Sequence, residues 1–396
     1  AFSTWGNPTE RASQGASTDE MYWLANDYQY NPYWGYQNGK IRNSRVIRDF
    51  SPSGIFTWDW KLNDNNKLIT SLFGKYSMYK STKLNYNGGD NPQPDYWKRL
   101  PSSYYDVWGN EYNTYQGYQD FLTARNHFMG STAARQISFD QLIYANRQAA
   151  AQGADAMYYI QARNSHALNL TLSSTLTSHI TGKSVWNNGF FVAHNNNNHF
   201  QTMEDMLGAS SFHNINTYAL GTYPTGSDRL QYDLNNANAA VKKGDRFAYD
   251  YHILVNRAQL WSNYTEDFGI VHYSIAARIG GQTMQRDGKM RNGLFADNSY
   301  GKSKTAKFFE GGIKASSDFN IGGGNTLTLG MGYDMHAPSA STAFYAPEVN
   351  NDFVMNLHNE RLLSSEIGYQ LLTSWLHANI NAYYNYLTNV TEWNCF

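Results

Sequence analysis

The sequence predicts an all-β protein whose antiparallel strands form a transmembrane β-barrel with long extracellular loops and one short loop helix. Three observations lead to this prediction. Apolar and polar residues alternate with a period of two in many segments, short and long connections between these segments alternate, and no apolar run approaches the length of a membrane-spanning helix. A chain without such a helix can cross a membrane only as a closed barrel.

The alternation is clearest in the segment from Thr373 to Asn389, and it recurs at 54–62, 168–181, 269–282 and 326–336. A period of two gives a strand one apolar and one polar face. In a barrel the apolar face meets lipid and the polar face meets the lumen. We expect the following residues to face lipid: Leu168, Leu170, Leu172, Val271, Ile275, Leu327, Leu329, Ile380 and Tyr384. We expect the following to face the lumen: Asn169, Thr171, His272, Arg278, Thr328, Asn379 and Asn381.

The predicted connections differ greatly in length. Short ones rich in Gly, Asn, Asp and Ser lie at 63–66, 182–184, 265–269, 320–325 and 373–374. Long ones lie at about 88–166, 196–245, 285–302 and 336–361. Short periplasmic turns and long outer loops are typical of outer-membrane barrels.

Two strands are longer than a membrane crossing requires. About 9 to 11 tilted residues cross the hydrocarbon layer, whereas Leu68 to Tyr86 and Phe247 to Tyr264 are much longer. We expect their ends to project beyond the membrane. In the second strand the apolar residues change from odd to even positions, which predicts a bulge near Asn256 and Arg257.

One helix is predicted inside a long loop. Ser138 and Gln141 form a capping box, and Gly153 occupies the position of a C-terminal cap. The first residues, 1–6, are expected to be loop.

Composition excludes several classes of protein. A net charge of −1 excludes a strongly basic nucleic-acid-binding surface, and a single cysteine, Cys395, excludes an intrachain disulfide. His194 and His199 are five residues apart, which places them on opposite faces of a strand, so no zinc site is expected. No catalytic motif is present, so neither an enzyme nor a cofactor is predicted.

Two aromatic clusters, at 31–45 and 91–110, and a charged segment at 280–293 are candidates for ligand binding. Aromatic rings with amide and guanidinium donors can hold sugars, peptides or planar ligands. The same residues could instead bury loop interiors or form a solvated charged tip, so both interpretations remain open. The candidate ligand-binding residues are Tyr33, Trp34, Tyr36, Tyr96, Trp97, Tyr104, Tyr105, Trp108, Arg286 and Arg291.

Several long blocks resemble the barrel portion of TonB-dependent receptors of Bacteroidetes. They are FQTMEDMLGASSFHNINTYALG (200–221), GGQTMQRDGKMRNGL (280–294), LHANINAYYNYL (376–387), YNPYWGYQNGKIRNSRV (30–46) and YDYHILVNRAQLWSNY (249–264). The resemblance implies a 22-stranded barrel in the cell outer membrane, filled by an N-terminal plug domain. It implies import of a scarce nutrient ligand, driven by TonB pulling on a short N-terminal motif. Outer-membrane lipid, TonB, the plug domain and a surface lipoprotein are the implied partners.

The sequence departs from this family at both ends, where no plug-like segment and no further strands are recognised. We therefore expect residues 1–396 to be part of one β-barrel domain within a larger receptor. The alternative function is a non-transporting, surface-exposed ligand-binding or adhesin-like β-protein that uses the same loops. The sequence does not identify the ligand.

Overall fold

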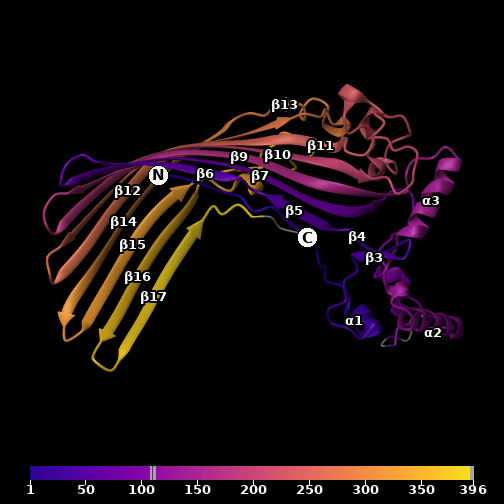
Figure 1. Ribbon diagram of the computed structural model, residues 1–396, viewed down its shortest axis with the longest axis horizontal. Helices are drawn as coiled ribbons and strands as arrows, with labels where there is room; N and C mark the ends of the chain where they lie inside the picture. The colour runs from indigo at the N-terminus through magenta and orange to yellow at the C-terminus, as the bar shows by residue number, and fades with distance from the viewer. Residues whose placement is uncertain (108, 110–112, 393–396) are drawn as a thin grey trace.

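The computed structural model describes residues 1–107, 109 and 113–392 and is built around one large antiparallel sheet (Figure 1). Eleven strands form its main path, each hydrogen-bonded to the next. In order of pairing they are β1 (Phe2–Trp5), β6 (Ser53–Lys61), β7 (Asn66–Tyr86), β9 (Tyr158–His179), β10 (Ser184–Asp205), β11 (Arg246–Asp267), β12 (Val271–Gly288), β14 (Ala306–Gly322), β15 (Asn325–His336), β16 (Glu360–Leu372) and β17 (His377–Thr388). The predicted antiparallel β architecture is confirmed.

Smaller strands pair beside this path. β5 (Val46–Phe50) pairs with β7 and β2 (Thr9–Ala12), and β13 (Gly301–Lys302) pairs with β12. A separate three-stranded sheet contains β3 (Trp34–Gln37), β4 (Lys40–Asn43) and β8 (Ile137–Ser138). Residues 1–6, expected to be loop, contain β1, because the backbone of Phe2–Trp5 pairs with β6.

The connections alternate in length as predicted. Five short turns, at 62–65, 180–183, 268–270, 323–324 and 373–376, join alternate pairs of strands. Four long connections, at 87–157, 206–245, 289–305 and 337–359, join the others. Figure 1 shows the short turns at the left and the helices and long connections at the right. The long connections therefore gather at one end of the sheet.

The strand register links the predicted lipid-facing residues across the sheet. Paired residues project from the same side of a sheet. Leu172 pairs with Leu72 and Val192, and the same row continues through Ala258 to Gly281. Following the pairs in this way places every residue predicted to face lipid on one side, which we call the apolar face.

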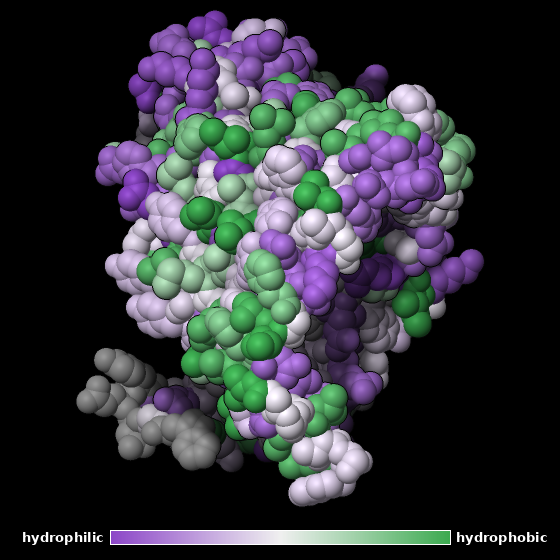
Figure 2. Space-filling view, turned by 90° about the vertical axis from the view of Figure 1, so that its left-hand side faces the viewer, coloured by the Kyte–Doolittle hydropathy of each residue, from purple (hydrophilic) through white to green (hydrophobic). Residues whose placement is uncertain are grey.

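The residues predicted to face the lumen all lie on the opposite side, which we call the polar face. His272 pairs with Asp318, Asp318 with Thr328, and Thr328 with Gly368, which pairs with Asn381. Figure 2 looks at the end that carries the short turns. It shows hydrophobic residues in green patches around this end and hydrophilic residues in the darker hollow beside them. The predicted division of the strands into two faces is confirmed.

The bulge predicted near Asn256 and Arg257 is wrong. These residues pair in unbroken register with His194 and Ala193, and the irregularity lies at 247–250, where Ala248 has a φ of 64°. The apolar residues of β11 change from odd to even positions because the environment of each face changes along the strand. Leu260 lies on the apolar face, whereas Ile253, nearer the long connections, lies on the polar face beneath a loop.

Three long connections cover the polar face at the end of the sheet where the long connections gather. Phe344, which follows α4 (Ala340–Ala343), and Ala337 pack against Tyr251, Ile253 and Met284. Residues Phe212 and Val241 of 206–245 pack against Tyr159 and Phe247 in a second core. These contacts cap the polar face at the end of the sheet with the long connections.

The fourth long connection packs on the apolar face. Leu84 and Ile160 share the parity of Leu170 and form a core with Phe139 and Leu142 of α3 (Phe139–Ala151). Residues 13–45 and 87–157 together make what we call the arm, which also contains α1 (Asp19–Ala25) and α2 (Tyr115–Gly130). The predicted helix is confirmed as α3, because the Ser138 hydroxyl accepts a bond from the Gln141 N–H. α1 and α2 were not predicted.

Asn146 of α3 joins the arm to the main sheet. Its side chain is fully buried. Its amide nitrogen donates to the carbonyl oxygens of Tyr158 (2.7 Å), Met206 (2.9 Å) and Leu207 (3.1 Å). Its oxygen accepts from the N–H groups of Met157 (2.9 Å) and Tyr158 (3.0 Å). One side chain therefore joins α3 to β9 and to the start of the next long connection.

Within the described residues, every helix is too short or too polar to span a bilayer.

Candidate functional site

Both predicted aromatic clusters lie in the arm. In the first, Trp34 and Tyr36 are edge to face with ring centroids 5.6 Å apart. The guanidinium of Arg45 donates to the Tyr33 hydroxyl (3.1 Å) and lies over its ring. In the second, Tyr96 and Trp97 are 6.2 Å apart.

A cavity of about 1060 Å³ lies between the two clusters, α2 and α3. Tyr36 from the first cluster and Tyr104 from the second both line it. Polar groups accompany these rings, among them Asp90, Arg99, His127 and Gln141. The structure therefore brings the two clusters together around one space that combines aromatic faces with hydrogen-bonding groups.

The accessibility of the predicted aromatic residues differs. The side chains of Trp97 and Tyr104 are 60% and 44% exposed, whereas Tyr105 packs edge to face against Tyr118 with centroids 5.3 Å apart. Trp108 lies outside the described residues. Trp97 and Tyr104 are thus the members of the second cluster that solvent reaches most easily.

Arg286 does not lie at a solvated tip, which was one of the two interpretations left open by the sequence. Only 2% of it is exposed. Its guanidinium donates to the carbonyls of Pro347 (2.6 Å) and Ser299 (2.7 Å) and to the Asn351 side chain (2.6 Å), and it stacks over Tyr251. Arg286 is buried because it joins two long connections on the polar face.

Arg291 is more exposed, and it lies in the connection 289–305. Its guanidinium donates to the Ala296 carbonyl (2.8 Å) and lies 3.6 Å from Asp297. Arg286, near the end of β12, and Arg291, in the connection that follows, both lie where loops cap the polar face, whereas the aromatic clusters belong to the arm on the apolar face. The structure therefore separates the predicted site residues into two groups.

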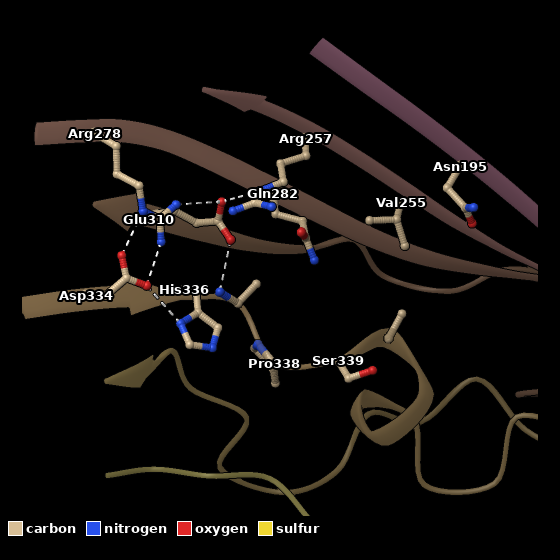
Figure 3. Close-up of a pocket in the computed structure, with 12 residues that line it drawn as sticks. Asn195, Val255, Arg257, Arg278, Gln282, Glu310, Asp334, His336, Pro338 and Ser339 are labelled. Atoms are coloured by element: carbon tan, nitrogen blue, oxygen red, sulfur yellow. Dashed lines mark hydrogen bonds and ion pairs between the residues drawn. The ribbon is translucent and has the colours of Figure 1, made fainter. Parts of the chain in front are cut away.

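A charged cluster that the sequence did not predict occupies the polar face (Figure 3). Glu310 is 1% exposed and accepts from Arg257 Nε (2.7 Å) and from the N–H of Ala337 (3.1 Å). Beside it, Arg278 forms two hydrogen bonds to Asp334. The cluster borders a space of about 500 Å³.

The cluster continues to the end of the next strand. His336 lies with Nδ1 3.1 Å from Asp334 and Nε2 3.2 Å from Glu360. Arg257 and Arg278 each have a carboxylate partner. The start of the connection 337–359 is held to β14 by the hydrogen bond from the Ala337 N–H to Glu310. Of the residues in this cluster, Arg278 is the one that the sequence predicted to face the lumen. The pairing of β14 with β12 and β15 is the additional information that brings Glu310 and Asp334 to it.

Two tyrosines outside the long strands, Tyr232 and Tyr30, keep their protons. Burial, followed by the neighbouring Tyr218 and Glu348, raises the pKa of Tyr232 to about 12. Burial also raises the pKa of Tyr30 in the arm, with a smaller contribution from Asp95, and the Tyr30 hydroxyl donates to the Arg135 carbonyl (2.7 Å). Both phenols therefore remain neutral hydrogen-bond donors near neutral pH.

His194 and His199 lie on opposite faces of β10, as their spacing predicted. His194 pairs with Asn256 on the apolar face, and His199 stacks on Tyr251 on the polar face with centroids 5.1 Å apart. In the part of the chain that the structure describes, no group of three or more His, Cys, Asp or Glu side chains is arranged to hold a metal ion.

Comparison with known proteins identifies the fold. No protein-family model and no curated protein sequence matches this chain. The solved structure of the ferric citrate transporter FecA, unliganded, is similar over 99% of this chain and 41% of its own, with a TM-score of 0.53 and 8% identity. The closed form of the ferric-catecholate import receptor Fiu from E. coli K12 is similar over 99% of this chain and 49% of its own, with a TM-score of 0.50 and 10% identity. The chain has the fold of outer-membrane β-barrel receptors and spans less than half the length of both.

Proposed function

We propose that this chain forms part of the barrel wall of an outer-membrane receptor that imports a nutrient ligand. The observation that carries the proposal is the continuous register, which links one apolar face and one polar face across the main strands of the sheet. An apolar face of this extent fits lipid, and a polar face fits a lumen. The cell outer membrane is the location that such a wall requires.

The lengths of the strands support a wall that rises above the membrane. β7, β9, β10 and β11 have 21, 22, 22 and 22 residues, about twice the number that crosses the hydrocarbon layer. The halves of these strands nearer the short turns carry the exposed apolar rows. The halves nearer the long connections are covered by loops and by the arm. The long connections would then face the exterior, where a receptor first captures its ligand.

The remaining parts of the proposal follow from the family resemblance of the sequence. Residues 1–396 would belong to one β-barrel domain, and a plug domain, TonB and a surface lipoprotein would be its partners. The similarity to FecA and Fiu over less than half of their lengths is compatible with a part of a larger barrel. We propose TonB-dependent import in preference to adhesion because the chain has a polar face suited to a lumen.

Paired cysteine substitutions test the orientation of the wall. Leu170→Cys and Thr171→Cys would be made in the full receptor with Cys395→Ser, so that each variant carries a single new thiol in this chain. In outer membranes, Leu170→Cys should react with a lipid-soluble maleimide and not with a charged one. Thr171→Cys should show a lower ratio of lipid-soluble to charged labelling. Equal ratios at the two positions would rule out a lipid-facing wall.

Uptake separates import from adhesion. Deletion of the complete gene should abolish TonB-dependent accumulation of at least one nutrient by the cell. Normal accumulation of all nutrients that require TonB, together with loss of surface attachment, would favour the adhesin.

A further inference from the structure

We propose that Lys83 and Arg163 form a binding site on the polar face for a small carboxylate or phosphate group. The site would bind an anionic part of the imported ligand, so its biological meaning rests on the proposed function. The anion chemistry itself rests on the placement of the side chains described below.

The sheet brings Lys83 and Arg163 close together. Lys83 of β7 pairs with Gln161 of β9, and Ser81 of β7 pairs with Arg163, so the two cations are diagonal neighbours. Diagonal neighbours on one face of a sheet are about 7 to 8 Å apart, within reach of long side chains. Both residues have the parity of Thr171 and therefore project from the polar face.

The cations are not neutralised by the surrounding protein. Arg45 and Arg163 are the charged groups that act on the Lys83 ammonium, and both repel it. Arg45 is partly engaged with Tyr33. Among the described residues, no carboxylate lies within the 4.0 Å of an ion pair from Lys83 or Arg163. Two neighbouring positive charges without an ion-pair partner in the described part of the chain favour a bound anion.

A cavity of about 220 Å³ opens in front of the two cations. Its walls add the amides of Asn85, Gln161 and Gln201 and the ring of Tyr159. Asn85 Nδ2 donates to Gln161 Oε1 (2.9 Å), which leaves the amide nitrogen of Gln161 as a donor for a ligand. The site therefore combines two exposed cations with neutral donors around one cavity, the kinds of group that bind a carboxylate or a phosphate.

Glu348 lines the same cavity from the connection 337–359. Its negative charge opposes binding of an anion. Removal of this charge should therefore strengthen the site. Loss of a cation and loss of this carboxylate are therefore expected to change the affinity for an anion in opposite directions.

A lipid headgroup is not the source of the anion, because Lys83 and Arg163 project from the face opposite to the proposed lipid-facing one. The polar face of a barrel is reached from the lumen or from the outer loops. The occupant is thus expected to be a soluble anion.

The test measures citrate binding to the purified full receptor by calorimetry, with ionic strength held constant by chloride. The wild type should bind citrate saturably with one site. Lys83→Gln and Arg163→Gln should each weaken binding about tenfold or more, because each removes one charge-assisted interaction. Glu348→Gln should tighten binding several-fold. Lys40→Gln, on the exposed strand β4 of the arm, makes the same charge change and should leave citrate affinity unchanged.

Either of two results would overturn the proposal: absence of saturable citrate binding to the wild type, or wild-type affinity in both Lys83→Gln and Arg163→Gln. Variants that lose the heat-modifiable band of a folded barrel are replaced by Lys83→Met and Arg163→Met, which keep an unbranched apolar stem and remove the charge. The proposed import function is tested by labelling and uptake, so failure of citrate binding leaves those results unaffected.

Discussion

Arg278 reaches Asp334 across the glycine that separates them in the sheet. Arg278 of β12 pairs with Gly312 of β14, and Gly312 pairs with Asp334 of β15. The guanidinium donates from Nε to Oδ1 (2.7 Å) and from Nη2 to Oδ2 (2.8 Å). A Cβ atom at position 312 would lie 2.5 Å from Asp334 Oδ1. The ion pair therefore depends on the absence of a side chain at this position.

Gly312→Ala should displace Asp334 from Arg278 and lower the free energy of unfolding by about 1 to 3 kcal/mol, the usual range for hydrogen bonds to charged groups. Urea unfolding of the full receptor in detergent measures this cost. In an Asp334→Asn background, Gly312→Ala should cost much less, because the ion pair is already lost. Additive costs of the two substitutions would show that Gly312 acts by another route.

Leu170→Arg should destabilise the protein by about 2 to 4 kcal/mol, because it places a charge in lipid near the middle of the membrane. Thr171→Arg projects from the polar face and should change stability by less than about 1 kcal/mol. The folded fraction in outer membranes and the urea midpoint both report the difference. Equal costs at the two neighbouring positions would argue against a lipid-facing apolar face.

Arg286→Ala should cost about 3 kcal/mol, because it empties a buried space and leaves the carbonyls of Pro347 and Ser299 without their donor. Connections 289–305 and 337–359 should then become sensitive to protease and exchange amide hydrogens faster. Arg291→Ala removes a more exposed guanidinium and serves as the matched control, with little change in either measurement. Unchanged protection in Arg286→Ala would show that these connections are held by their apolar contacts alone.

Trp97→Ala should weaken ligand capture while leaving barrel assembly intact, because the side chain is exposed and belongs to a loop. Assembly is checked by the heat-modifiable band, and capture by growth of cells whose nutrition depends on the gene. Trp34→Ala tests the first cluster in the same way. Wild-type growth of the double variant would mean that the aromatic clusters stabilise the arm and that the ligand binds on the polar face.

The strands were predictable from the sequence because their chemistry repeats locally. A period of two is visible in residues such as Leu168 to Leu172, and the register then extends it across the sheet. β1 was missed because a four-residue strand such as Phe2–Trp5 carries too little alternation. α2 was missed because only Phe128 of its residues is buried, so it lacks a clear apolar stripe.

The candidate sites depend on long-range pairing and were predicted less completely. The sequence identified the aromatic clusters, but not that Tyr36 and Tyr104 line one cavity. Arg286 looked like part of a solvated tip because it stands among charged residues, whereas its partners Pro347 and Asn351 come from another connection. The bulge predicted near Asn256 was wrong for a similar reason. The positions of apolar residues along a strand depend on what covers each face as well as on strand pairing.

The arm and the capping loops pack on opposite faces of the same sheet. Leu84 and Ile160 hold the arm on one side, while Tyr251 and Met284 hold the capping loops on the other. Insertions or deletions within α2 can therefore change the arm without changing the residues that line the polar face. Under the proposed function, selection acting on the outer surface and selection acting on the ligand then fall on separate parts of one chain.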